Sequence, residues 1–187
     1  MAVRIAINGF GRIGRQLAAL ATRDSRLELS LVNDPMPLES AEYLLTHDSA
    51  RCIRSLDVQR AAGALIIEDS RVVFTHGTDA AELPLAENEV DVVVESSGLV
   101  RERNGLKGFL EAGAKRVVTC YPLAGEGDMT VLPGINEDEV GDEEIVSAGT
   151  CTAHGLAPVM KVLDDRFEVE SGFFTSVHAT TSDQPSV

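Results

Sequence analysis

The sequence predicts an α/β protein with a doubly wound, mostly parallel β-sheet. Short apolar runs rich in β-branched residues recur along the chain, and helical or loop segments separate them. Strands made of nearly continuous apolar runs suit a parallel sheet that is covered on both faces. The expected strands are 3–7, 28–32, 72–74, 90–94, 116–119, 129–132 and 145–147.

A glycine-rich turn follows the first expected strand, and a helical pattern begins directly after it at residue 15. Gly9 permits a tight strand-to-helix turn, Gly11 lets the backbone approach a pyrophosphate, and Gly14 lets helix and strand pack closely. The free amides at the helix N-terminus favour phosphate charge there. The turn therefore predicts a Rossmann-type dinucleotide site formed by Gly9, Phe10, Gly11, Arg12, Ile13 and Gly14.

The second expected strand ends at Asp34, about 20 residues after the glycines, where such sites place an acid against the adenosine ribose. A carboxylate there accepts hydrogen bonds from the ribose hydroxyls and repels a 2′-phosphate, so NAD is preferred over NADP. The plainer alternative is a tight turn without a ligand, in which Asp34 only caps the turn.

Ser96, Ser97 and Gly98 follow another expected strand. The carboxyl ends of parallel strands meet at one edge of the sheet, where open α/β sheets bind their ligands. We expect these three residues to contact the nicotinamide half of the cofactor, although an ordinary strand-to-helix turn would also have this sequence.

Cys151 follows the last short strand and a Gly-Thr turn, and apolar residues then recur at helical spacing from Leu156 to Phe167. The spacing predicts a helix that begins at or next to Cys151, although Pro158 would normally argue against one. A helix N-terminus favours the thiolate, and its amides can stabilise an oxyanion. The alternative is a small buried residue at a strand–helix junction.

His178 ends the apolar run 171–177, which we expect to be a strand. An imidazole near the thiol can deprotonate it and then take the proton of a hemithioacetal hydroxyl as hydride leaves. A lone histidine at a strand end is more often structural. His154 is a rival for the role of base, because it lies three residues beyond Cys151 on the same expected helix.

Composition limits the remaining function classes. The net charge of −14 disfavours nucleic acid as a generic partner. Three cysteines without CxxC spacing argue against a disulfide framework and a zinc site, and the acidic stretch 137–144 is expected to be a solvated turn, so no metal site is predicted. With no run of 18 apolar residues and no leader, we expect a cytoplasmic protein without a membrane partner.

The order of these motifs resembles the glyceraldehyde-3-phosphate dehydrogenase family over the whole chain. The residues that carry the resemblance are 6–15, 32–35, 94–98, 113–118, 133–136, 147–152 and 177–181. The resemblance implies an NAD-dependent oxidoreductase of glycolysis that oxidises glyceraldehyde 3-phosphate to 1,3-bisphosphoglycerate through a thioester on Cys151, with His178 as base. It also implies that Cys120 lies near the cofactor and that Thr150, Thr152, Thr181 and Asp183 bind the substrate or inorganic phosphate; capping and turn formation explain these last four equally well.

Three segments depart from this family. The family reads Cys-Thr-Thr-Asn where residues 151–154 are Cys-Thr-Ala-His, so that His154 replaces the asparagine. It reads Ser-Asn-Ala-Ser where residues 147–150 are Ser-Ala-Gly-Thr, and Ser-Ala-Pro where residues 120–122 are Cys-Tyr-Pro. Erythrose-4-phosphate dehydrogenases share most of the motifs and are one alternative. A truncated or divergent NAD-binding relative without turnover is the other.

The chain has about half of the length that the resemblance leads us to expect. We expect an NAD-binding domain at 1–150 and the beginning of an incomplete α+β catalytic domain at 151–187, which is too short for a core of its own. The 187-residue chain alone is therefore expected to be inactive, and the full-length protein is expected to be a homotetramer.

Overall fold

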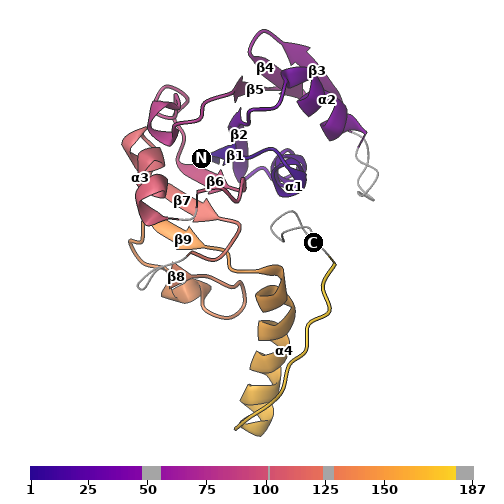
Figure 1. The fold of residues 1–187 in the computed structure, drawn as a ribbon, viewed down its shortest axis with the longest axis vertical. Helices are drawn as coiled ribbons and strands as arrows, with labels where there is room; N and C mark the ends of the chain where they lie inside the picture. The colour runs from indigo at the N-terminus through magenta and orange to yellow at the C-terminus, as the bar shows by residue number, and fades with distance from the viewer. Residues whose placement is uncertain (48–55, 101, 124–128, 180–187) are drawn as a thin grey trace, which may run out of the picture.

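A computed structural model describes residues 1–47, 56–100, 102–123 and 129–179. Within these residues a single sheet has the strand order β3-β4-β5-β2-β1-β6-β7-β9-β8 (Figure 1). The strands are β1 (Val3–Asn8), β2 (Leu27–Asn33), β3 (Val58–Ala61), β4 (Ala64–Ile67), β5 (Ser70–Thr75), β6 (Val92–Glu95), β7 (Arg116–Thr119), β8 (Met129–Thr130) and β9 (Ile145–Ser147). The helices are α1 (Arg12–Ala21), α2 (Leu38–Thr46), α3 (Arg103–Glu111) and α4 (Cys151–Phe167), with 3-10 turns η1 (Ala80–Glu82) and η2 (Glu137–Glu139).

The sheet is parallel from β5 to β8, which confirms the predicted fold class. β1 pairs with β2 on one side and with β6 on the other, so that Ile7 faces Val32 and Val94. Strand order reverses between these two neighbours of β1, and ligands of such sheets bind at this reversal.

One edge of the sheet is antiparallel and was not predicted. β3 pairs with β4, and β4 pairs with β5. Ala61 pairs with Ala64, so the β3–β4 turn has two residues, and Gly63 in it has a φ of +62°. The signal in the sequence was weak because β3 contains polar Gln59 and Arg60.

Helices cover both faces of the sheet (Figure 1). Alternate residues of a strand point to opposite faces, so Ile5 and Ile7 pack with the apolar side of α1, whereas Ala6 packs on the α3 side with Phe109. Phe10, directly after β1, is fully buried and meets the Phe74 ring edge-on at 6.0 Å. Each such side chain contributes about 1.5–3 kcal/mol by leaving water. These two cores hold the strand ends that form the site.

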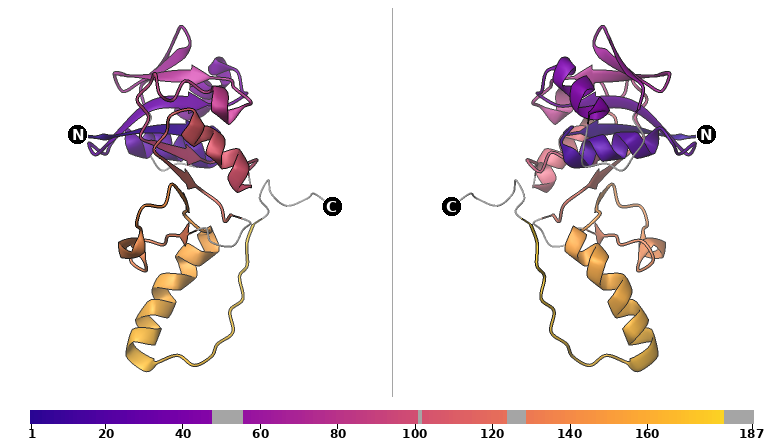
Figure 2. Two further views of the ribbon diagram at one scale, coloured as in Figure 1. Left: turned by 90° about the vertical axis from the view of Figure 1, so that its left-hand side faces the viewer. Right: turned by 90° about the vertical axis from the view of Figure 1, so that its right-hand side faces the viewer.

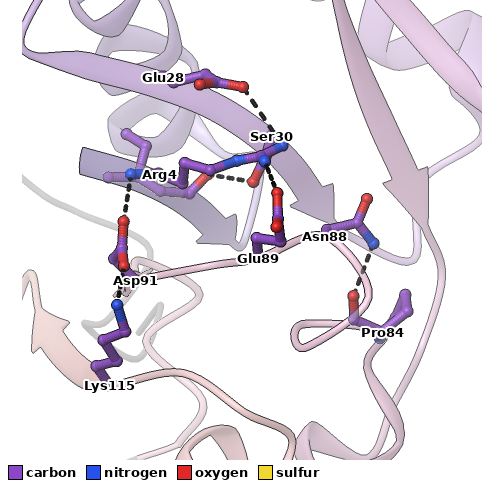
Figure 3. Close-up of polar contacts among 9 residues, drawn as sticks. Arg4, Glu28, Ser30, Pro84, Asn88, Glu89, Asp91 and Lys115 are labelled. Atoms are coloured by element: carbon purple, nitrogen blue, oxygen red, sulfur yellow. Dashed lines mark hydrogen bonds and ion pairs between the residues drawn. The ribbon is translucent and has the colours of Figure 1, made fainter. Parts of the chain in front are cut away.

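Charged side chains tie neighbouring strands together at their amino ends (Figure 3). The glycine turn follows the other, carboxyl end of β1. Asp91 accepts from the backbone N–H of Arg4 at 2.9 Å and from Nζ of Lys115 at 2.6 Å. The hydrogen bond from Lys115, and then that from Arg4, lowers the pKa of Asp91. The guanidinium of Arg4 also pairs with Glu89 and, at 3.3 Å, with Glu28. These contacts fix the beginnings of β1, β6 and β7 relative to one another.

The helix predicted after the Gly-Thr turn is confirmed, and the strand predicted at 171–177 is wrong. α4 extends from Cys151 to Phe167 despite Pro158, and Glu168 ends it in the left-handed conformation with a φ of +53°. Residues 168–179 have no regular secondary structure and run back beside α4 (Figure 2). A strand needs a neighbour for its backbone groups, and no described strand pairs with this segment.

Candidate active site

A pocket of about 350 Å³ opens at the carboxyl edge of the sheet, where strand order reverses. Turns that follow β1, β2, β5 and β6 form it, and α3 closes one side with Phe109. Five residues predicted from the sequence line it: Gly9, Gly11, Asp34, Ser96 and Ser97. Sequence reasoning missed Asn8, Asn33, Pro35, Gly77, Thr78, Ala80, Leu83, Leu99, Val100 and Phe109.

The three glycines of the turn have different local needs. A Cβ on Gly9, whose φ is +92°, would lie 2.4 Å from the backbone nitrogen of Ser97. A Cβ on Gly14 would lie 2.1 Å from the carbonyl oxygen of Gly9, so helix and turn are in direct contact there. A Cβ on Gly11 would meet nothing within 4 Å. Gly9 and Gly14 are thus required by the fold, whereas the space beside Gly11 is open.

Asp34 fixes the glycine turn from the end of β2. Its Oδ2 accepts from the backbone N–H of Phe10 at 2.6 Å, and its Oδ1 accepts from that of Met36 at 2.8 Å. Each carboxylate oxygen has a second lone pair, and both remain available to ribose hydroxyls. Asp34 also caps a turn, as in the plainer alternative, and it lines the pocket.

The other predicted cofactor residues lie around the pocket rather than in its lining. The side chain of Phe10 is fully buried in the core, so only its backbone faces the turn. Arg12 and Ile13 are exposed on the first turn of α1, and Gly98 has a φ of +72° in the turn after β6. Cys120 is half-buried; burial, and then the charge of Glu95, raises the pKa of its thiol to about 11.

The turns on either side of the strand reversal are bonded to each other. The Ser96 hydroxyl donates to the carbonyl oxygen of Gly9 at 2.7 Å, and its backbone N–H donates to that of Asn8 at 2.8 Å. Ser97 donates to the buried carboxylate of Glu95 through its backbone N–H at 2.7 Å and its hydroxyl at 2.6 Å. The polar residues that end β1, β2 and β6 were the signal that sequence reasoning left unused.

These features fit a dinucleotide. The open space beside Gly11 admits a pyrophosphate at the N-terminus of α1, where the first backbone N–H groups have no partner inside the helix. Asp34 at the end of β2 matches a ribose diol, and Ser96 and Ser97 lie across the strand reversal from it.

The predicted thiol and imidazole are brought together although they are 27 residues apart. Sγ of Cys151 lies 3.2 Å from Nε2 of His178, and both residues are exposed. Cys151 is the first residue of α4, whose N-cap is Thr150. The chain reaches this contact because 168–179 turns back along α4 (Figure 2).

The hydrogen-bond partners of His178 define its tautomer. Its Nδ1 lies 2.6 Å from the carbonyl oxygen of Ala179, which can only accept, so Nδ1 carries the hydrogen. In the neutral ring Nε2 is then an acceptor directed at the thiol. The hydrogen bond between Cys151 and His178 is the main cause that lowers the pKa of Cys151, and the contact with Ala179, followed by that with Cys151, raises the pKa of His178.

His154 is directed away from this pair. Its Nε2 lies 2.6 Å from the carbonyl oxygen of Ala148, so it carries a hydrogen and holds the turn before α4. Ala148 is itself tied to the end of β7, because its N–H donates to the carbonyl oxygen of Thr119 at 2.9 Å.

The two threonines beside Cys151 make different contacts. The Thr150 hydroxyl accepts from the backbone N–H of Ala153 at 3.0 Å as the cap of α4, and the hydroxyl of Thr152 helps to lower the pKa of Cys151. Thr181, Asp183 and Cys52 lie outside the described residues.

The described part of the chain holds neither a cluster of metal ligands nor a membrane-spanning helix. No three His, Cys, Asp or Glu side chains are grouped there as metal ligands. None of its helices is long and apolar enough to cross a membrane.

The fold and the two sites define a class: a nucleotide-binding protein whose Rossmann-type sheet leads directly into a helix that begins with an imidazole-paired cysteine. Residues 3–103 match the family described as glyceraldehyde 3-phosphate dehydrogenase, NAD binding domain, and residues 150–187 match the C-terminal domain of the same family. The chain belongs to the glyceraldehyde-3-phosphate dehydrogenase family, and its nucleotide-binding part is the family's NAD-binding domain.

Relatives from distant organisms agree with this assignment. The chain is 37% identical to glyceraldehyde-3-phosphate dehydrogenase 2 of Bacillus subtilis over 100% of its own length and 55% of the relative's. It is 38% identical to the cytosolic enzyme of Trypanosoma brucei brucei, over 100% and 56% of the two lengths. It is 39% identical to that of Zymomonas mobilis, over 98% and 56%. The chain thus spans about half the length of these relatives.

Proposed function

We propose that this chain is the nucleotide-binding part and the thiol-bearing segment of an NAD-dependent dehydrogenase that oxidises glyceraldehyde 3-phosphate with phosphorylation. The observation that carries the proposal is the contact at 3.2 Å between Sγ of Cys151 and Nε2 of His178 at the N-terminus of α4. The names and activity of the relatives support it, because they match the chain over its whole length.

The proposed chemistry uses the thiol as nucleophile. The thiolate of Cys151 adds to the aldehyde carbon, and the amides at the N-terminus of α4 stabilise the resulting oxyanion. Nε2 of His178 passes the proton it took from the thiol to this oxyanion, and it accepts the proton back from the hemithioacetal hydroxyl as hydride leaves the same carbon. Bound NAD supplies the hydride acceptor. Inorganic phosphate attacks the thioester that remains on Cys151, which releases the acyl phosphate and returns the thiolate.

Cofactor choice forms part of the proposal. Asp34 would bind the adenosine ribose hydroxyls and exclude a 2′-phosphate, Ser96–Gly98 and Cys120 would lie on the nicotinamide side, and Gly9–Gly14 would hold the pyrophosphate. Thr150, Thr152, Thr181 and Asp183 are proposed for the substrate and attacking phosphates. The hydroxyl of Thr150 caps α4 and still has a hydrogen to donate.

Domain organisation and assembly also remain proposals. We propose the boundary at 150–151, since the last strand of the sheet ends at Ser147 and α4 begins at Cys151. A cytoplasmic location is supported by the cytosolic relative, and a homotetramer is proposed for the full-length protein.

The decisive experiment is a product analysis of the full-length enzyme with glyceraldehyde 3-phosphate and NAD, with and without inorganic phosphate. We expect acyl phosphate only when phosphate is present. Release of the free acid irrespective of phosphate, with faster turnover of erythrose 4-phosphate, would instead favour an erythrose-4-phosphate dehydrogenase. Absence of NADH formation with either aldehyde would favour a binding protein without turnover and would refute the proposal.

A further inference from the structure

Side-chain hydrogen bonds join the ends of four adjacent strands below the nucleotide pocket. Glu95 ends β6, Asn8 ends β1, Asn33 ends β2 and Thr75 ends β5, and Gly77 follows β5. We call these five residues the strand-end network. Glu95 is fully buried and Asn33 is 5% exposed, while Asn8, Asn33 and Gly77 line the pocket.

From Thr75 and the N–H of Gly77 through Asn33 and Asn8 to Glu95, each hydrogen bond is donated toward Glu95, and Nδ2 of Asn33 also donates to the carbonyl oxygen of Gly77 at 2.9 Å. Nδ2 of Asn8 donates to Oε2 of Glu95, and Nδ2 of Asn33 donates to Oδ1 of Asn8 at 2.7 Å. Oδ1 of Asn33 accepts from the hydroxyl of Thr75 and from the backbone N–H of Gly77, both at 2.8 Å.

Both ends of the network impose this direction. Both carboxyl oxygens of Glu95 accept hydrogen bonds, from Asn8 and from Ser97, and the backbone N–H of Gly77 only donates. Reversing the amide of Asn8 or of Asn33 would therefore place two donors or two acceptors face to face. Glu95 and the N–H of Gly77 favour the same orientation of the Asn8 and Asn33 amides, so each amide has one favourable orientation.

Glu95 also holds the turn on its other side. Its Oε1 accepts both the backbone N–H and the hydroxyl of Ser97, and Ser97 lines the pocket. Asn8, bound to Oε2, directly precedes Gly9, which packs against the backbone of Ser97. One buried carboxylate thus connects the two turns that face each other across the strand reversal.

We propose that Glu95 is a positioning residue for the nucleotide, which sets the direction of the strand-end network and so holds Asn8 and Ser97 in the arrangement that binds NAD. Glu95 itself does not line the pocket, so its effect passes through these two neighbours. Binding then needs no further ordering of the two turns, which is the benefit of a preorganised site. The inference rests on the proposed function as an NAD-binding dehydrogenase.

Glu95→Gln tests the direction of the network at nearly constant side-chain size. The amide nitrogen of the new side chain meets either Nδ2 of Asn8 or the N–H of Ser97, and both are donors. If Asn8 reverses, the conflict passes to Asn33 and ends at the N–H of Gly77, which cannot accept. We expect NAD affinity, measured by calorimetry, to fall about tenfold, because one buried donor is left unpaired.

A second substitution should restore the direction. In Glu95→Gln combined with Asn8→Asp, the carboxylate at position 8 accepts from the glutamine at position 95 and from Asn33, and the net charge equals that of the unaltered protein. We expect NAD affinity to return to within about threefold of its original value, because every donor again has an acceptor. Asn8→Asp alone places two carboxylates together and should weaken binding.

Folded protein must be compared with folded protein. Affinities are measured at a temperature at which circular dichroism shows every variant folded, and thermal unfolding is recorded in parallel. A role in stability alone would lower Tm and leave the Kd for NAD unchanged, which would overturn the inference. A double variant that binds NAD no better than Glu95→Gln would also overturn the inference. If Glu95→Gln does not fold, the inference requires that the double variant folds and binds NAD. Failure of the unaltered protein to bind NAD would instead refute the proposed function itself.

Discussion

The two parts of the candidate site are held in place in different ways. The nucleotide pocket is formed by the ends of strands that are packed on both faces of the sheet, and side-chain hydrogen bonds fix those ends. Cys151 and His178 are exposed, and α4 contains no buried residue. Thr150 caps α4, and the contact of His154 with the carbonyl oxygen of Ala148 ties the first turn of this helix to the turn before it.

This difference indicates which part depends on further protein. Val162 is 63% exposed, Phe167 is 75% exposed and Val177 is 98% exposed, and apolar side chains of this size are normally covered. The relatives are nearly twice as long as this chain. We therefore expect nucleotide binding to be measurable in residues 1–187, whereas the thiol pair needs the full-length enzyme.

The largest effect is expected at the thiol. In the full-length enzyme, Cys151→Ser should reduce aldehyde oxidation to background and leave the Kd for NAD unchanged, because a hydroxyl is a poor nucleophile near neutral pH. Cys120→Ser is the matched control and should retain turnover, since the raised pKa of Cys120, about 11, keeps its thiol protonated. Preferential labelling of Cys120 over Cys151 by iodoacetamide would contradict the assignment of Cys151 as the nucleophile.

His178→Asn should lower turnover about 10²–10⁴-fold, the usual cost of losing a general base. It should also move the pH dependence of Cys151 alkylation. The pKa of Cys151 lies below its ordinary value mainly because of His178, so removing the imidazole raises the pKa and shifts the alkylation midpoint to higher pH. His154→Asn should leave that midpoint in place, because His154 binds Ala148 instead. A shift with His154→Asn only would assign the base to His154.

Two glycine variants separate folding from binding in the nucleotide part. Gly14→Ala should lower the free energy of unfolding by about 3 kcal/mol, because its Cβ would lie 2.1 Å from the carbonyl oxygen of Gly9. Gly11→Ala meets no protein atom within 4 Å and should change stability by less than about 1 kcal/mol.

Gly11→Ala should nevertheless weaken NAD binding, since the methyl group occupies the space proposed for the pyrophosphate. Chemical denaturation of both variants gives the free energy of unfolding, and calorimetry gives the NAD affinity. Normal NAD affinity in Gly11→Ala would place the pyrophosphate elsewhere.

The smallest predicted effect concerns cofactor choice. Asp34→Asn removes the charge that would repel a 2′-phosphate and retains an oxygen for the N–H of Phe10 or Met36. We expect the ratio of NAD to NADP affinity to fall about tenfold, a difference of about 1.4 kcal/mol. An unchanged ratio would show that another residue excludes NADP.

Local patterns in the sequence predicted the parts of the fold that depend on short stretches of chain. The glycine turn, Asp34 at the end of β2 and the start of α4 at Cys151 each follow from a few neighbouring residues. The strand predicted at 171–177 was wrong because an apolar run does not by itself supply a neighbouring strand. The strand-end network was missed because Asn8, Asn33 and Glu95 meet only through the order β2-β1-β6, which no single segment encodes.

The order in which the chain is synthesised determines when Cys151 and His178 can first come into contact. Every strand that the structure describes in the sheet has been synthesised by Ser147, before the 27 residues from Cys151 to His178 are complete. At ordinary rates of synthesis this interval lasts about 1–5 s. During that time the thiol lacks the hydrogen bond with His178 that lowers its pKa, so we expect a smaller fraction of thiolate than in the folded protein. The reactivity of Cys151 should therefore rise when the chain turns back and His178 reaches it.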